Sequence, residues 1–188
     1  MAHGFSATIV GSPRIYTSGT AVTETVPATA TSVIIEVYGG GASGTGIASG
    51  GGTPTGGQGG GYAKKTVTVV AGNTFTYTVA ALITGTGGGI TPSNIGNAST
   101  VVNGTAPTTN INSGQAGSTS PSGGNINTSA ATPGTGPSGT NGAGPLGGAA
   151  GSTLGADGTA PGGGGAGNNL SGIPGSGARG QIIFTYYA

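Results

Sequence analysis

Glycine recurs through most of this chain and separates a few short segments that have the pattern of β-strands. It accounts for 46 of the 188 residues, a share more typical of disordered or collagen-like chains. A glycine that becomes ordered in a regular element loses about 0.5–1 kcal/mol more than alanine does, and few large side chains are present to offset that loss. We therefore expect the glycine-rich regions to be held by backbone hydrogen bonds between closely packed extended segments.

The longest glycine-rich stretch, residues 103–176, has a period of three. The glycines of this pattern are Gly136, Gly139, Gly142, Gly148, Gly151, Gly155 and Gly158, with breaks of register at Pro145 and before Gly155. Three residues per turn is the period of the extended polyproline II helix, whereas the breaks and the small number of triplets argue against collagen. We predict several short, left-handed glycine helices that lie side by side. A flexible linker is the alternative.

Alternating apolar residues predict β-strands in the rest of the chain. Residues 32–38 are the clearest strand, and residues 64–70 and 74–83 flank Ala71-Gly72-Asn73, which predicts a hairpin. The apolar strand at 182–187 should pair inside the core. Shorter strand patterns occur at residues 8–10, 14–16, 21–26 and 99–102. Because no segment has helical periodicity, the predicted fold class is all-β.

Charge is nearly absent from the chain. Four Lys and Arg residues and three Asp and Glu residues leave a net charge of +1. The basic residues, which form no evident patch, are Arg14, Lys64, Lys65 and Arg179. Affinity for nucleic acid comes mainly from Lys and Arg contacts to phosphates, so nucleic acid is not an expected partner. No apolar run approaches the ~20 residues of a membrane span, and no secretory signal is evident, so neither membrane insertion nor standard export is expected.

Residues that could carry chemistry are few and scattered. The chain has no cysteine and one histidine, His3, which cannot make a metal site alone. The acids are Glu24, Glu36 and Asp157; a glycosidase-type pair is formally possible, but we expect Glu24 and Glu36 to be solvated on strand faces. No serine has a histidine base in a recognisable motif. We therefore predict no catalytic residues, no cofactor and no metal, and a protein that is not an enzyme.

Two pairs of adjacent residues have alternative interpretations. Lys64 and Lys65 follow a glycine run, but the pattern lacks the Gly-Lys-Ser/Thr of a phosphate-binding loop, and we expect the lysines to mark an exposed strand and to discourage edge pairing. Tyr186 and Tyr187 could form a binding surface, since tyrosine suits interfaces. The alternative that we favour places one of these two rings in the core and the other at its rim.

Three stretches in a fixed order carry a family resemblance. They are residues 26–41, with Val33-Ile34-Ile35-Glu36-Val37-Tyr38 followed by three glycines; residues 59–79, with Gly59-Gly60-Gly61-Tyr62-Ala63-Lys64-Lys65; and residues 177–184, with Arg179-Gly180-Gln181-Ile182-Ile183-Phe184. Together they resemble the glycine-rich domain of bacteriophage tail-fibre and adhesin-type virion proteins, over roughly residues 20–188.

The resemblance implies a small antiparallel β-sandwich with long glycine-rich insertions that form polyglycine or polyproline-II-like helices. It implies a virion structural protein, assembled in the host cytoplasm, on the exterior of the particle in a tail fibre or at its tip. Residues 21–188 would form the glycine-rich domain, and residues 1–20 are a candidate segment for docking onto another virion protein. The expected partners are other virion proteins, in a multimeric arrangement, and a bacterial surface receptor.

Host contact by such a chain would be uncharged. Backbone groups and Ser, Thr and Asn side chains in loops near residues 42–58, 84–97 and 105–133 would form the hydrogen bonds. A capsid decoration protein is the alternative function. An ice-binding protein is a more remote one, suggested by the threonine row at 74, 76 and 78, and a coat polymer outside viruses also remains open.

Overall fold

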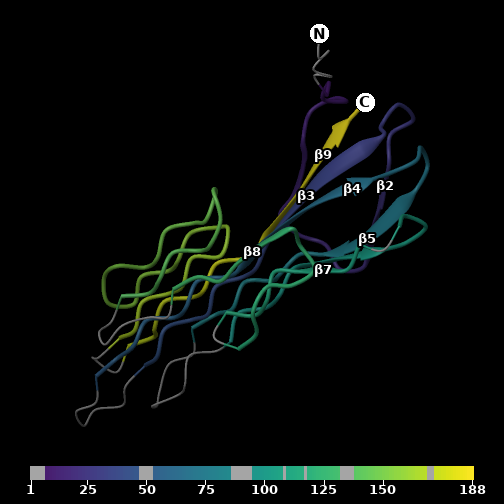
Figure 1. The fold of residues 1–188 in the computed structure, drawn as a ribbon. Helices are drawn as coiled ribbons and strands as arrows, with labels where there is room; N and C mark the ends of the chain where they lie inside the picture. The colour runs from purple at the N-terminus through teal and green to yellow at the C-terminus, as the bar shows by residue number, and fades with distance from the viewer. Residues whose placement is uncertain are drawn as a thin grey trace.

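The fold is an elongated body with a β-sandwich at one end and a bundle of extended segments at the other (Figure 1). This computed structural model describes residues 7–46, 53–85, 95–107, 109–116, 118–131, 138–168 and 172–188. Within these residues there are strands and turns but no helix, and therefore no helix that is long and apolar enough to cross a membrane. The prediction of an all-β fold is confirmed.

Nine strands among the described residues form two antiparallel sheets. The first sheet has the order β1 (Arg14–Tyr16), β9 (Gln181–Tyr187), β3 (Ser32–Tyr38), β4 (Tyr62–Thr68) and β8 (Ile126–Thr128). The second has the order β2 (Val22–Thr25), β5 (Thr74–Thr78), β6 (Thr100–Asn103) and β7 (Ile111–Asn112). This arrangement agrees with the predicted β-sandwich.

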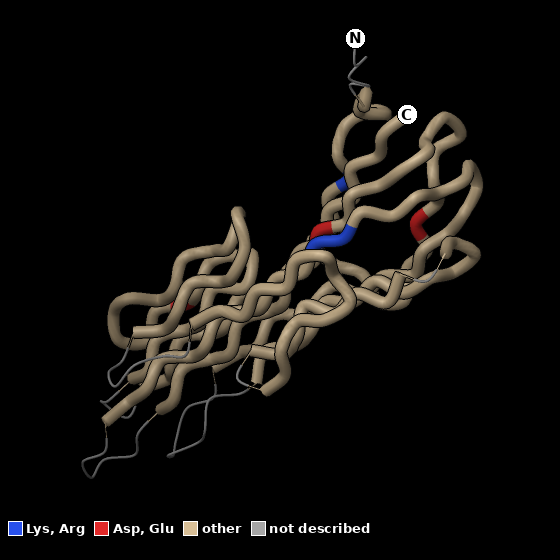
Figure 2. Tube along the Cα trace, in the orientation of Figure 1, with Lys and Arg blue, Asp and Glu red and all other residues tan. Residues whose placement is uncertain are grey.

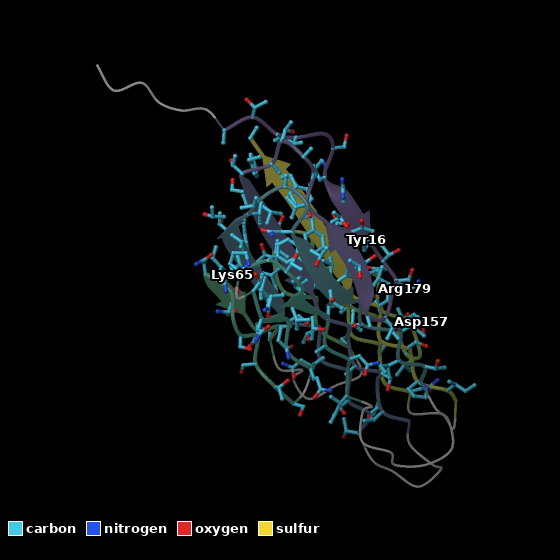
Figure 3. All side chains as sticks on the ribbon, turned by 90° about the vertical axis from the view of Figure 1, so that its right-hand side faces the viewer. Tyr16, Lys65, Asp157 and Arg179 are labelled. Carbon is cyan, nitrogen blue, oxygen red and sulfur yellow. The ribbon has the colours of Figure 1, made fainter. Side chains whose placement is uncertain are left out.

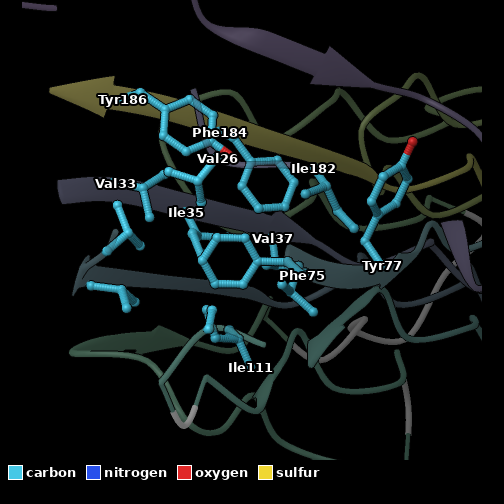
Figure 4. Packing of buried hydrophobic residues seen from close by; sticks show 14 of the residues in the cluster. Val26, Val33, Ile35, Val37, Phe75, Tyr77, Ile111, Ile182, Phe184 and Tyr186 are labelled. Carbon is cyan, nitrogen blue, oxygen red and sulfur yellow. The ribbon is translucent and has the colours of Figure 1, made fainter. Parts of the chain in front are cut away.

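The core lies between the two sheets. Every second side chain of β3 points inward, and Val33, Ile35 and Val37 are all 0 % exposed, as the period-two pattern of a strand requires. Figure 4 shows these residues facing Phe75 of the second sheet, with Phe184 of β9 beside them. Strand β9 pairs with β1 on one side and β3 on the other, so the prediction that the C-terminal strand pairs inside the core is confirmed.

The predicted hairpin between residues 64–70 and 74–83 is wrong. β4 belongs to the first sheet and β5 to the second, so the turn between them carries the chain across the sandwich. The turn itself forms, since the Asn73 N–H donates to the Val70 carbonyl at 3.0 Å. The two strands meet through their side chains, Val67 of β4 and Phe75 of β5 both lying in the shared core.

The expectation for Lys64 and Lys65 also needs correction. β4 lies between β3 and β8 and is not an edge strand. Its second neighbour, β8, and the short strand β7 both lie inside residues 103–176, where the sequence shows only glycine-rich patterns. The strand predicted at residues 14–16 is confirmed as β1, which pairs with β9 and extends the first sheet.

Beyond the sandwich, extended segments run side by side and are joined by backbone hydrogen bonds at every third residue. The bonds between residues 39–46 and 53–61 are donated by Gly39, Ala42 and Thr45 and accepted by Gly61, Gln58 and Thr55. Residues 39–46 also bond to other segments, because the Gly40 N–H donates to Asn97 and the Gly41 N–H to Ala178. Successive N–H groups of one segment therefore point to three different neighbours.

The breaks in the glycine register coincide with turns between segments. The Gly147 N–H donates to the Gly144 carbonyl at 3.1 Å, and the Ala156 N–H donates to the Thr153 carbonyl at 2.9 Å. Gly144 has a φ of 86°, a backbone conformation that glycine adopts without the steric cost of a Cβ atom. The interruptions seen in the sequence are thus the points where the chain reverses direction.

Residues 162–168, the central segment, lie at the middle of the bundle. Within the described part of the chain it is hydrogen-bonded through its backbone to six neighbouring segments, which are residues 39–46, 53–61, 138–144, 147–152, 155–160 and 172–180. The backbone groups of three consecutive glycines make hydrogen bonds to all six of these segments. Gly163 bonds to Thr159 and Ala178, Gly164 to Thr140 and Gly151, and Gly165 to Ala42 and Gly57.

The interior of the bundle contains almost no side-chain volume. Residues 161–167 are buried although they read Pro-Gly-Gly-Gly-Gly-Ala-Gly. A Cβ atom placed on Gly164 would collide with the carbonyl group of Gly57, and one on Gly163 with that of Ala149. The bundle is therefore held by backbone contacts that only glycine at these positions permits.

Candidate functional site

The charged residues are sparse and lie mostly on the sandwich (Figure 2). Among the described residues, no group of three or more His, Asp, Glu or Cys side chains could hold a metal ion. His3 lies outside the described residues. Asp157, in the bundle, is exposed and accepts a hydrogen bond from the Ser176 N–H at 2.6 Å.

Glu24 is buried, so the expectation that it is solvated is wrong. Its side chain lies between the sheets and the residue is 3 % exposed. Its Oε1 accepts from Arg14 Nη1 at 2.6 Å and from the Tyr186 hydroxyl at 2.9 Å, and its Oε2 accepts from the Tyr16 hydroxyl at 2.6 Å. The signal was present in the sequence, because Glu24 lies two residues before Val26, which is buried in the core, and alternate residues of an extended segment share a face.

These four residues, Arg14, Tyr16, Glu24 and Tyr186, form the Glu24 cluster. Burial and the hydrogen bond to Glu24 raise the pKa of Tyr16 to about 12. Burial, followed by the charge and the hydrogen bond of Glu24, also raises the pKa of Tyr186. Buried charges in proteins are normally paired and hydrogen-bonded in this way, so we interpret the cluster as a structural link between β2 of one sheet and β1 and β9 of the other.

Glu36 lies on the outer face of the first sheet, half-buried. It accepts a hydrogen bond from the Tyr62 hydroxyl at 2.6 Å, and its neighbours across the sheet are Lys64 and Ile183. Burial, followed by the hydrogen bond to Glu36, raises the pKa of Tyr62. Glu36 and Glu24 thus have separate sets of partners.

The favoured interpretation of the two C-terminal tyrosines is confirmed. Tyr186 is 2 % exposed and belongs to the core, whereas Tyr187 is half-buried at the end of β9. The adjacent rings thus have different roles because successive side chains of a strand point to opposite faces.

A pocket of about 250 Å³ lies where two of the expected recognition loops approach each other. It is lined by Gln58, Gly59, Gly61, Gln115, Ala116, Ser118, Thr119, Ser120, Pro121, Ser129 and Ala130. The Gln58 amide donates to the Ala130 carbonyl at 3.1 Å and so joins two of its walls. No lining residue is charged, and hydroxyl and amide groups can both donate and accept hydrogen bonds. This neutral pocket suits a small uncharged polar ligand.

Only part of each expected recognition loop can be described. Residues 47–52 of the first loop, 86–94 of the second, and 108, 117 and 132–133 of the third lie outside the described residues. The neutral pocket draws on Gln58 from the first loop and on residues 115–121 and 129–130 from the third. The structure thus brings parts of two of the loops together.

The outer face of the second sheet carries a regular array of threonines. Thr74, Thr76 and Thr78 of β5 are half-buried and point outward. Each lies directly opposite another threonine on a neighbouring strand; these partners are Thr25, Thr23 and Thr100. Sequence reasoning identified the row on β5 but not the partners, because their strands are distant in the chain.

No protein-family model matches this chain. Comparison with curated proteins likewise finds no significant match.

Proposed function

We propose that this chain is a structural, non-enzymatic protein on the exterior of a bacteriophage particle, in a tail fibre or at its tip, where it contacts the host surface. Its glycine-rich insertions would form a rigid platform of polyglycine-II-like helices. The β-sandwich would anchor this platform to other virion proteins, with the part of residues 1–20 that precedes β1 as the docking element.

The six-neighbour packing of the central segment carries this proposal. A β-strand directs its backbone hydrogen bonds to two sides, whereas a helix with three residues per turn directs them to three. Gly163, Gly164 and Gly165 donate to three different segments, which supports the second geometry. A bundle bonded in this way is stiff in all lateral directions, a useful property for a platform that holds recognition loops away from its base.

The polar surface agrees with a role outside the cell. Contact with a host surface through hydroxyl and amide groups is insensitive to ionic strength, because no charge takes part. The neutral pocket, lined by Gln58, Gln115 and several serines, offers one such surface. It lies on loops that the bundle and the first sheet support.

The test is immunogold electron microscopy of purified phage particles from cultures that produce this chain. Label at fibre ends is expected and would support host contact. Label spread over the head would replace the proposal by the alternative of a capsid decoration protein. Particles without label, from a preparation in which the antibody recognises the free chain, would reject a virion role.

The threonine array favours one second candidate, ice binding. Neighbouring strands lie about 4.7–4.9 Å apart and alternate residues of one strand about 6.4–6.8 Å apart, so the three Thr–Thr pairs place methyl and hydroxyl groups at regular spacings. Thermal hysteresis of the purified chain is the test, with Thr76→Lys at the centre of the array and Thr128→Lys on the other sheet as matched control. Hysteresis lost only with Thr76→Lys would favour this function, and no hysteresis in the wild type would remove it.

A further inference from the structure

A second pocket, of about 180 Å³, lies at the junction between sandwich and bundle. Its walls are the loop at residues 17–20, which follows β1, the segment at residues 79–82, which follows β5, and Arg179. Figure 3 shows Arg179 just beyond the level of Tyr16 along the molecule. We call it the Arg179 pocket, and neither the Glu24 cluster nor the neutral pocket contributes a residue to it.

Arg179 is a cation without a counter-ion in the described part of the chain. Arg14 is paired with Glu24, and Lys64 lies opposite Glu36 in the sheet, but Arg179 is exposed and makes no ion pair with any described residue. Its backbone is fixed, because its carbonyl accepts from the Gly162 N–H at 2.9 Å. The guanidinium group is thus carried by a rigid base and remains available to an anion.

The loop opposite Arg179 has an unusual backbone. Gly19 has a φ of 131° and Ala21 a φ of 51°, and the second value is costly for a residue that has a Cβ atom. Two hydrogen bonds hold the loop in place, from the Ala21 N–H to Thr78 Oγ1 at 3.0 Å and from the Val79 N–H to the Gly19 carbonyl at 2.9 Å. Backbone strain that the surrounding structure maintains is frequent at ligand sites.

The loop also presents hydroxyl groups to the pocket. Thr17, Ser18 and Thr20 line it, and within the described residues their side chains form no hydrogen bond to the protein. On the opposite wall, Val79 and Leu82 supply apolar surface, Leu82 being 46 % exposed. The pocket therefore combines a cation carried on a hydrogen-bonded backbone, several hydroxyl groups and a small apolar wall.

We infer that the Arg179 pocket binds the carboxylate of an acidic sugar residue. A guanidinium group matches a planar carboxylate with two parallel hydrogen bonds. The hydroxyl groups of the loop can bond to the ring hydroxyls of the sugar, and the apolar wall suits the C–H face of its ring. The pocket is smaller than the ~300–1,000 Å³ of typical ligand sites, so it would admit one residue of a longer glycan. The inference rests on the proposed host contact for its biological setting, and it adds a charged determinant to a surface otherwise expected to be neutral.

The experiment is an NMR titration of the isotope-labelled full chain with two matched sugars, methyl galacturonoside and methyl galactoside, which differ in the carboxylate. We expect saturable shifts at Ser18, Thr20 and Leu82 with the acidic sugar and none with the neutral one. Arg179→Gln should weaken binding about fivefold or more. Lys64→Gln, which makes the same change of net charge on the first sheet, should leave binding unchanged.

Three outcomes would overturn the inference. They are equal binding of the two sugars, unchanged binding by Arg179→Gln, and shifts confined to residues outside the pocket. A separate titration with inorganic phosphate tests whether the pocket binds a phosphate group instead of a carboxylate. Binding of phosphate without binding of the galacturonoside would overturn the carboxylate assignment.

A cell-binding assay separates this inference from the proposed function. If fluorescently labelled wild type binds bacteria and Arg179→Gln does not, both are supported. If both variants bind equally, the host contact stands and the pocket has no part in it. If the wild type binds no bacteria, the host contact fails, and the NMR titration alone decides the chemistry of the pocket.

Discussion

Gly164 lies where a side chain of any size would meet backbone. The atom that a new methyl group would strike is the Gly57 carbonyl, which belongs to a segment fixed by its own hydrogen bonds and cannot swing away as a side chain would. We predict that Gly164→Ala lowers the free energy of unfolding by about 3 kcal/mol or more. Equilibrium denaturation with urea measures the change.

Gly72→Ala is the matched comparison for that substitution. Gly72 has a φ of 77° and open space around the position of a Cβ atom, so alanine there would suffer only the cost of the left-handed backbone, about 1–2 kcal/mol. An equal or smaller loss for Gly164→Ala than for Gly72→Ala would contradict the steric account of the bundle.

Glu24 offers a second test at the scale of single residues. Glu24→Gln keeps the shape of the side chain but removes the charge that accepts from Arg14, Tyr16 and Tyr186. Hydrogen bonds to charged groups contribute more than neutral ones, and we predict a loss of about 1.5–3 kcal/mol in the free energy of unfolding. Glu36→Gln, at the half-buried acid on the outer face of the first sheet, should lower the free energy of unfolding by a smaller amount. The reverse order would show that the Glu24 cluster does not link the sheets.

At the scale of elements, the sequence predicted the positions of the strands better than it predicted which strands pair. The patterns at 32–38 and 182–187 coincide with β3 and β9 because both strands bury one full face, which makes their alternation regular. The pairing of 64–70 with 74–83 was wrong because the same turn residues serve a hairpin and a crossing between sheets. β7 and β8 were missed because two or three residues are too few to show a period.

The central segment should behave as a stable element although it is neither helix nor strand. Gly163, Gly164 and Gly165 are buried and their amides all donate to backbone carbonyls of other segments, and exchange from such sites requires opening of the bundle. We predict protection against hydrogen exchange comparable to that of the β3 amides, measured by NMR. Exchange at the rate of the exposed 17–20 loop would contradict this prediction.

The whole molecule should be sensitive to alkali. Burial, with contributions from Glu24 or Glu36, raises the pKa of five tyrosines above the ordinary value of 10.0, to about 12 for Tyr16 and Tyr38. Because the folded protein holds these protons more tightly than the unfolded chain does, their contribution to stability is complete below pH 10 and is lost as the pH rises through 12.

Thermal unfolding, followed by circular dichroism from pH 8 to pH 12, measures this effect. The midpoint should fall steeply above pH 10, and Tyr16→Phe should make the fall less steep because one of the titrating groups is gone. A midpoint that stays constant to pH 12 would show that the rings are not held as described.

At the scale of the whole molecule, the sequence predicted only part of the architecture. The period of three identified the glycines that face other segments, among them Gly139, Gly148 and Gly151, each of which abuts the backbone of another segment. The sequence could not predict which segments become neighbours, since backbone groups are the same at every residue and do not specify a partner. The Arg179 pocket was hidden for a related reason, as its walls come from three separate parts of the chain.

The backbone-filled bundle has a consequence for the dependence of stability on temperature. Unfolding of an ordinary core exposes apolar surface and raises the heat capacity, whereas exposure of polar peptide groups lowers it. A body in which one end buries mainly peptide groups should therefore have a small heat-capacity change for its length and a flat stability curve. Such a protein would keep much of its stability over a wide range of temperatures, both cold and warm.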